Sequence, residues 1–292
     1  MPFDPTMIHG SSIARLRALE QIDAWSAANA AAGVVAGGAV VATRGEVDRG
    51  FAWASVTKPV TALAVLVAAE EGILDLDEPA GPPGATVRHL LAHASGLPFE
   101  GSKPIGKPGA RRIYSNTGFE VVADFLAERA EMSFAEYLSQ AVLEPLGMEA
   151  ELRGSAGAGL FGSLADLLRV GEELLTPTLM APETLAEATS VQFPGLAGVI
   201  PEMGRFDPND WGLGFELKDA KPGHWSGTKT SDRTFGHWGA MGTFLWVDPN
   251  VNAALGVLTD RGFGDWAKEA WPRLSDAVYA ELLTEPGSVR NL

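Results

Sequence analysis

The chain has 292 residues, of which 46% are apolar and 20% are charged, as is typical of a folded globular protein with one large unit or two lobes. Its 22 basic and 37 acidic residues give a formal net charge of −15, which argues against nucleic acid and anionic membrane surfaces as partners. Because cysteine is absent, disulfides, thiolate nucleophiles and cysteine-based metal sites are excluded.

The beginning of the chain is predicted to contain a helix, a strand and a second helix. Apolar residues at every third position predict an amphipathic helix from Ser11 to Ala32, and the Val-rich run from Gly33 to Thr43 predicts one buried strand. Ser55 can cap a mostly apolar helix that stops at Gly72. No apolar segment follows a basic start, so we expect no signal peptide or membrane span and a cytoplasmic location.

The middle of the chain is predicted to be helical and its end to be rich in strands. Further helices are expected at 86–93, 117–146 and 163–175. Short β-like runs are expected at 212–217, 234–238, 243–248 and 252–259, before a last helix at about 265–283. Strands near both ends and helices in the centre imply that the two ends meet in one sheet while the centre forms a second lobe.

Ser55 and Lys58 form an S-x-x-K motif at the start of the apolar helix. Positions three apart share one helix face, so the hydroxyl and the amine are neighbours where backbone N–H groups are unpaired. A lysine in apolar surroundings is discouraged from carrying its proton and can act as a base towards serine. The motif alone is equally compatible with a serine cap beside a solvated lysine.

Two further motifs lie at predicted element boundaries. In Tyr114-Ser115-Asn116, the tyrosine can relay a proton and the asparagine can hold both the lysine and a substrate carbonyl. The run from His237 to Gly242 leads into a predicted strand, where Gly239 permits close backbone approach and a strand-edge N–H can form half of an oxyanion hole with that of Ser55. Each motif alone also suits an ordinary turn.

The three motifs in this order, S-x-x-K, Y-x-N and H-x-G, resemble the serine β-lactamase and penicillin-binding protein superfamily, in its class C-like branch of β-lactamase-like esterases and D-alanyl peptidases. Segments such as ASVTKPVTALAVLVAAEEGILDLDEP and FGHWGAMGTFLWVDP extend the resemblance over roughly residues 51–262. It implies a two-lobed α/β (α+β) fold with an antiparallel sheet flanked by helices. The sheet lobe would comprise residues 1–75 and 206–292, with an all-helical lobe at 76–205 and the active site in the cleft between them.

The resemblance implies that Ser55 is acylated while Lys58 and Tyr114 handle its proton, without deciding which of the two is the base. It implies substrate-orienting roles for Asn116, His237 and Gly239. The oxyanion would be held by the backbone N–H groups of Ser55 and Ala240. No metal or cofactor is implied, and the oligomeric state is not indicated.

Two departures from the family pattern favour an esterase. The stretch before Ser55 is too short for the extra strand and loops of relatives, and Trp238 replaces a small hydroxyl residue that helps to bind a substrate carboxylate. Trp238 and Trp211 are possible pocket walls. We therefore predict a serine hydrolase acting on a small ester or amide through an acyl-enzyme, as a β-lactamase-like carboxylesterase. The alternatives are a β-lactamase or D-alanyl-D-alanine carboxypeptidase, and a non-catalytic scaffold or binding protein of the same fold.

Two other patterns are interpreted as structural. The run Gly101–Lys107 resembles a phosphate-binding loop, but Pro108 replaces the required Ser or Thr and no strand precedes it. His89 and His93 are four residues apart on a predicted helix, but Leu90 occupies the position where a zinc protease would need glutamate, so they are predicted to be a structural pair.

Overall fold

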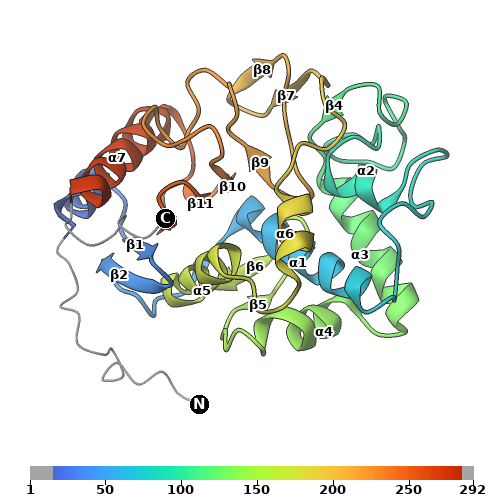
Figure 1. Cartoon of the computed structure of the whole chain (residues 1–292), viewed down its shortest axis with the longest axis horizontal. Helices are drawn as coiled ribbons and strands as arrows, with labels where there is room; N and C mark the ends of the chain where they lie inside the picture. The colour runs from blue at the N-terminus through green and yellow to red at the C-terminus, as the bar shows by residue number, and fades with distance from the viewer. Residues whose placement is uncertain (1–15, 285–292) are drawn as a thin grey trace.

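The computed structural model describes residues 16–284, which are built around a six-stranded antiparallel sheet (Figure 1). The strand order is β2-β1-β12-β11-β10-β9. The strands are β1 (Ala30–Ala36), β2 (Ala39–Arg44), β9 (Glu216–Leu217), β10 (Phe235–Gly239), β11 (Thr243–Asp248) and β12 (Ala253–Thr259). Because β1 pairs with β12, with Ala30 opposite Thr259, the two ends of the described chain meet in one sheet, as expected.

The first segments differ from the sequence prediction. The predicted strand 33–43 is wrong because Gly37 and Gly38, with φ angles of 59° and 81°, form the turn of a β1–β2 hairpin that needs two left-handed residues. The predicted helix 11–32 is also wrong. Its described part is a 3₁₀ helix, η1 (Arg17–Ala24), followed by the alanines of β1; residues 11–15 lie outside the described part. Pairing with strands on both sides overrides the helix propensity of those alanines.

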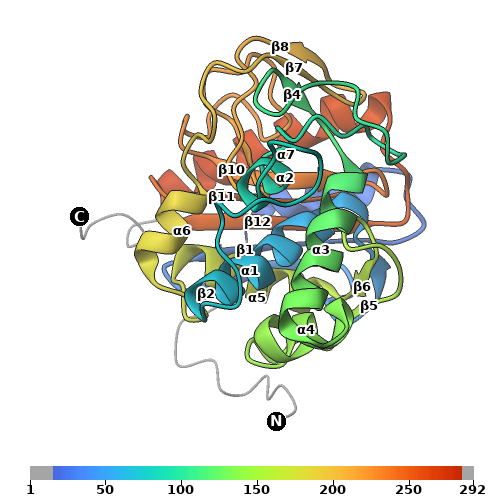
Figure 2. The same ribbon diagram turned by 90° about the vertical axis from the view of Figure 1, so that its right-hand side faces the viewer.

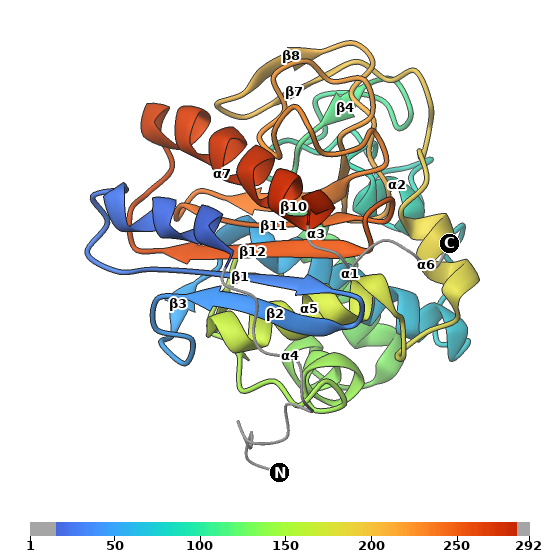
Figure 3. The ribbon, with the colours of Figure 1, turned by 60° about the vertical axis from the view of Figure 1, so that its left-hand side comes forward.

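Helices cover both faces of the sheet (Figure 3). Helix α5 (Leu164–Leu175) packs on β1, β11 and β12, and Ser163 caps it with a reciprocal hydrogen-bond pair to Asp166. Helix α7 (Asp265–Thr284) packs against η1 and covers the other face, where Trp246 Nε1 donates to Ser275 Oγ at 3.0 Å. The sheet is therefore buried on both sides.

Helix α1 (Thr57–Glu70) is buried from its first residue to Ala68, and α3 (Asn116–Ala130), α4 (Phe134–Leu138) and the π-helical turn η3 (Ser139–Leu143) pack directly on it. The other helical segments of this part of the chain are α2 (Val87–Leu91) and α6 (Pro182–Ala188). The predicted helix 117–146 is therefore divided. The division occurs because Glu131 adopts a left-handed conformation, φ 53°, and Ser133 caps a new helix.

Two small sheets complete the fold. Because several of their strands lie in the segment 76–205, the expectation that this segment is all-helical is wrong. One contains β3 (Phe51–Ala52), β6 (Leu160–Gly162) and β5 (Glu151–Leu152). The other contains β4 (Arg112–Ile113), β7 (Gly198–Ile200) and β8 (Gly204–Phe206), which lie together in Figure 2. Since α5 from this segment packs on the main sheet, the two-lobe boundaries at 76 and 205 stay a prediction.

Between residues 16 and 284, none of the helices combines the length and the apolar character needed to cross a membrane.

Candidate active site

Ser55 lies in a single 3₁₀ turn, η2 (Ala54–Val56), directly before α1. The preceding Ala54 has a left-handed φ of 48°, a conformation that costs energy for a residue with a Cβ. The prediction that Ser55 caps the helix is wrong, because the cap position is occupied by Val56 and no side chain caps α1. The Ser55 hydroxyl instead accepts a hydrogen bond from Lys58 Nζ at 3.0 Å.

Lys58 is fully buried and its amine has three acceptors. Nζ donates to Ser55 Oγ at 3.0 Å, to Asn116 Oδ1 at 2.7 Å and to the Gly157 carbonyl oxygen at 2.8 Å. Burial lowers the pKa of Lys58 from 10.5 to about 7, although the nearby Glu120 carboxylate acts in the opposite direction. Near neutral pH, a large fraction of Lys58 is therefore an uncharged amine beside the serine.

Tyr114 follows β4 and brings its ring to the same place. The Lys58 Nζ atom lies 4.8 Å from the centre of the Tyr114 ring, and the Ser55 side chain is near enough to the Tyr114 hydroxyl to affect its pKa. Burial raises the pKa of Tyr114, and the nearby Ser55 side chain only partly offsets this effect. Tyr114 is therefore a neutral phenol at physiological pH.

Tyr114 is partly buried and belongs to a group of four aromatic side chains whose other three members are buried, here called the ring group: His93, Tyr114, Trp211 and His237. His93 lies 4.5 Å from the Tyr114 ring and 4.7 Å from the Trp211 ring. Trp211 is only 1% exposed, so it supports the other rings from behind rather than lining the surface of a pocket.

His93 is a site component that the sequence analysis missed. It does not pair with His89, whose ring instead lies 4.2 Å from that of Phe193. Its Nδ1 atom accepts a hydrogen bond from the Ser115 N–H at 3.1 Å, and this fixes the backbone next to Tyr114. Burial and the positive charge of Lys58 lower the pKa of His93 well below its usual value, so its ring is neutral.

His237 and Trp238 are adjacent on β10, so their side chains point to opposite faces of the sheet. The His237 ring joins the ring group, 5.9 Å from that of Tyr114. The Trp238 ring packs 4.3 Å from Phe263 and 6.2 Å from Trp271 of α7. Trp238 therefore lies in the aromatic layer under α7, on the other face of the sheet from His237, and not in a pocket wall as predicted.

Gly239 permits the end of β10 to contact the turn that carries Ser55. A Cβ at Gly239 would lie 2.5 Å from the Trp53 carbonyl oxygen, which is closer than real Cβ atoms approach, and a tight 3.1 Å from the Ala54 Cβ. The hydroxyl of Thr243 donates to the same Trp53 oxygen at 2.8 Å. The backbones of Ser55 and of the residue after Gly239, Ala240, are thereby brought to one side of the site.

The comparison with known proteins agrees with this geometry. The model of the Beta-lactamase family matches residues 17–150 and 149–279, which together span most of the chain. The chain belongs to this family. A solved β-lactamase from Mycobacterium bovis is 51% identical, with a TM-score of 0.90 over 91% of this chain and 99% of that one.

Curated relatives carry different functional names. Esterase EstB of Burkholderia gladioli is 24% identical in a match that covers 80% of this chain and 83% of the esterase. Penicillin-binding protein 4* of Bacillus subtilis (strain 168) is 30% identical over 131 residues, and the match spans only 29% of that protein's length. The β-lactamase fold and a family of hydrolases are therefore shown, whereas the substrate differs among the relatives.

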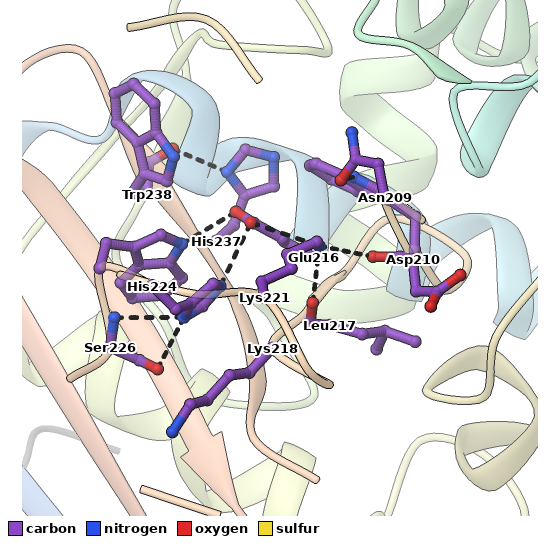
Figure 4. A network of polar contacts seen from close by, with 12 residues as sticks. Asn209, Asp210, Glu216, Leu217, Lys218, Lys221, His224, Ser226, His237 and Trp238 are labelled. Atoms are coloured by element: carbon purple, nitrogen blue, oxygen red, sulfur yellow. Dashed lines mark hydrogen bonds and ion pairs between the residues drawn. The ribbon is translucent and has the colours of Figure 1, made fainter. Parts of the chain in front are cut away.

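A buried ionic network in this β-lactamase-family chain lies next to the ring group: Lys221 is 5.7 Å from the Trp211 ring, and Figure 4 shows the network beside His237. Glu216 accepts from Trp225 Nε1 at 2.8 Å and contacts His224 Nε2 at 3.2 Å and Lys221 Nζ at 3.5 Å. Burial favours the protonated carboxyl, but Lys221 and His224 outweigh it and hold the pKa of Glu216 at about 2. Glu216 pairs with Gly236 on β10, so the network supports the strand that carries His237.

The sequence contained no signal for this network. A segment in which acidic residues, lysines and histidines are mixed with glycines and prolines has the composition of an exposed loop. The network is also not a metal site: residues 16–284 contain no group of three or more His, Asp or Glu side chains placed to hold a metal ion.

Proposed function

We propose that the protein is a serine hydrolase that forms an acyl-enzyme at Ser55 and cleaves a small ester, as a carboxylesterase does. The observation that carries the proposal is the buried Lys58 amine, which lies 3.0 Å from the Ser55 hydroxyl and has its pKa lowered to about 7. An uncharged amine at hydrogen-bond distance from a hydroxyl is the arrangement that activates a serine.

In the proposed reaction, Ser55 Oγ attacks the substrate carbonyl carbon and its proton passes to Lys58 Nζ. The backbone N–H groups of Ser55 and Ala240 hold the resulting oxyanion. Tyr114 gives its proton to the leaving alkoxide and regains one from Lys58. Water then attacks the acyl-enzyme, with the proton transfers reversed, to release the acid and restore Ser55.

Lys58 is assigned as the base because burial leaves the two candidates suited to opposite roles in proton transfer. Burial favours the uncharged form of each group, and the uncharged form is the base for an amine but the acid for a phenol. Asn116 accepts from Lys58 through Oδ1 and thereby keeps the amine in place, with its amide N–H₂ as the donor for a substrate oxygen.

A second candidate function, β-lactamase activity, is favoured by the 51% identity to a protein described as a β-lactamase. Its chemistry would use the same Ser55 acylation on a cyclic amide. The two candidates therefore differ in substrate and not in the residues that act.

The test combines covalent labelling with turnover. Intact mass after treatment with a fluorophosphonate should show one adduct on the wild type and none on Ser55→Ala, while Ser102→Ala, at an exposed serine, should still be labelled. Hydrolysis of 4-nitrophenyl acetate and butyrate should be lost with Ser55 only, and nitrocefin turnover measures the second candidate. A folded wild type that is not labelled would contradict the proposal and favour a non-catalytic scaffold.

A further inference from the structure

The cationic side chains around the ring group already donate hydrogen bonds to other groups of the protein. Lys58 and Arg112 are the cations that act electrostatically on His93, and Lys221 lies 5.7 Å from the Trp211 ring. Lys58 donates to Ser55, Asn116 and Gly157. Arg112 is buried and donates to the carbonyl oxygens of Ala92, Gln192, Phe193 and Asn209.

Lys221 is bound in the same way. Its amine donates to the carbonyl oxygens of Asp210 and Leu217, both at 2.7 Å, and contacts the Glu216 carboxylate. None of these three cations is therefore available to pair with a carboxylate on a substrate. A substrate carboxylate that loses its hydration on binding and gains no such partner makes the binding weaker.

The tautomer of His237 follows from its hydrogen bond. Nδ1 lies 2.7 Å from the Trp238 carbonyl oxygen, and because a carbonyl can only accept, the proton is on Nδ1. Nε2 therefore carries a lone pair. It is buried and has no hydrogen-bond partner among residues 16–284. Burial and the charge of Lys58 lower the pKa of His237 to about 3, so the ring stays neutral.

Two exposed apolar side chains belong to segments that carry site residues. Phe99 is 46% exposed and its ring stacks 6.0 Å from that of Tyr114, while its carbonyl oxygen accepts from the Asn116 N–H at 3.0 Å. Met241 is 42% exposed and follows Ala240. These two residues, here called the apolar rim, offer surface to a lipophilic group and no partner to a charged one.

We propose that His237 makes the Ser55 site selective for uncharged substrates, whose lipophilic part contacts the apolar rim, and makes it exclude substrates with a carboxylate near the scissile carbonyl. The substrate class is thus an uncharged lipophilic ester. This inference rests on the proposed function, because it concerns the substrate of the same serine. The lone pair on Nε2 repels a carboxylate oxygen, whereas a donor at this position would attract it.

A pair of boronic acids tests this selectivity without a hydrolysis step. Ser55 Oγ adds to the boron atom and passes its proton to Lys58, which gives a tetrahedral boronate without a leaving group. 3-Carbamoylphenylboronic acid and 3-carboxyphenylboronic acid have nearly the same shape and differ in charge. Their inhibition constants are measured from the slowing of fluorophosphonate labelling, in about 0.5 M NaCl to screen the acidic surface.

The wild type should bind the carbamoyl compound at least about tenfold more tightly than the carboxy compound. In His237→Lys, whose amine donates in either protonation state, the ratio should fall by at least about tenfold. His237→Gln introduces an uncharged hydrogen-bond donor and should lower the affinity ratio by about threefold or more. This second variant allows the test to be made even if His237→Lys does not fold. Leu283→Lys adds the same charge on the exposed end of α7 and should leave the ratio unchanged.

Equal affinities of the wild type for the two boronic acids would overturn the inference. So would an affinity ratio that is the same in both His237 variants as in the wild type, or one that Leu283→Lys changes as much as His237→Lys does. Each of these results leaves Ser55 labelled and the proposed function intact. Failure of the proposed function has a different signature, the absence of labelling in the wild type. The His237 tautomer can be measured separately, because the ¹⁵N shift of Nε2 should be that of an unprotonated ring nitrogen.

Discussion

The acylation rate should follow the deprotonation of Lys58, and Glu120 provides a way to shift it. Glu120 Oε1 accepts from the Gly157 N–H at 3.2 Å, and the Gly157 carbonyl oxygen accepts from Lys58 Nζ at 2.8 Å. With the pKa of Lys58 at about 7, roughly one tenth of the amine is neutral at pH 6 and about one hundredth at pH 5. We therefore expect kcat/KM to fall about tenfold per pH unit below the midpoint.

Glu120→Gln removes the carboxylate that raises the pKa of Lys58, so the acid limb of the profile should move to lower pH. The shift should be smaller than the one caused by burial, because burial is the larger effect on Lys58. The assay is kcat/KM for 4-nitrophenyl acetate between about pH 5 and 9. Glu128→Gln, an exposed position on the same helix, is the control. A limb that moves to higher pH, or activity that does not depend on pH below 7, would refute Lys58 as the base.

Three further predictions concern packing and charge. Gly239→Ala places a Cβ 2.5 Å from the Trp53 carbonyl oxygen, so kcat/KM should fall about a hundredfold; an unchanged value with a lower Tm would contradict the role of this contact. Leu63→Ala, at a fully buried position of α1, should lower the free energy of unfolding in urea by about 2–5 kcal/mol, and a loss below about 1 kcal/mol would show that α1 is loosely packed. Glu216→Gln leaves Lys221 buried without its counter-ion and should cost about 3–5 kcal/mol at pH 7, most of which the double variant with Lys221→Met should restore. Because the pKa of Glu216 lies at about 2 instead of 4.5, the stability from its charge is complete above pH 4.5 and is lost as pH falls towards 2. Tm measured against pH should show this loss in the wild type and not in Glu216→Gln.

The parts of the structure with strong local patterns could be predicted from the sequence. The S-x-x-K spacing placed Ser55 and Lys58 side by side, and the short β-like runs near the end of the chain correctly predicted β10, β11 and β12. The helix expected at 163–175 is α5, which the structure places at Leu164–Leu175. In each case the signal lies within a few residues of the feature it predicts.

The parts that could not be predicted depend on contacts between distant segments. The alanines before Gly33 form a strand because β12 lies beside them, and no local pattern shows that neighbour. Lys221 and Glu216 read as surface charges because only the fold brings them together. His93 was judged by its spacing from His89, although its actual contact is the ring of Tyr114 on another segment.

The pairing of β1 with β12 also has a consequence for synthesis of the chain. Ala36 lies opposite Ala253, so the ribosome must add about 220 residues before β1 can find its second neighbour. Until then, the nascent β1–β2 hairpin has an open edge of small apolar residues, which is a template for pairing with other chains. We therefore expect a premature stop before β12 to yield an aggregation-prone fragment and not a less stable form of the folded protein.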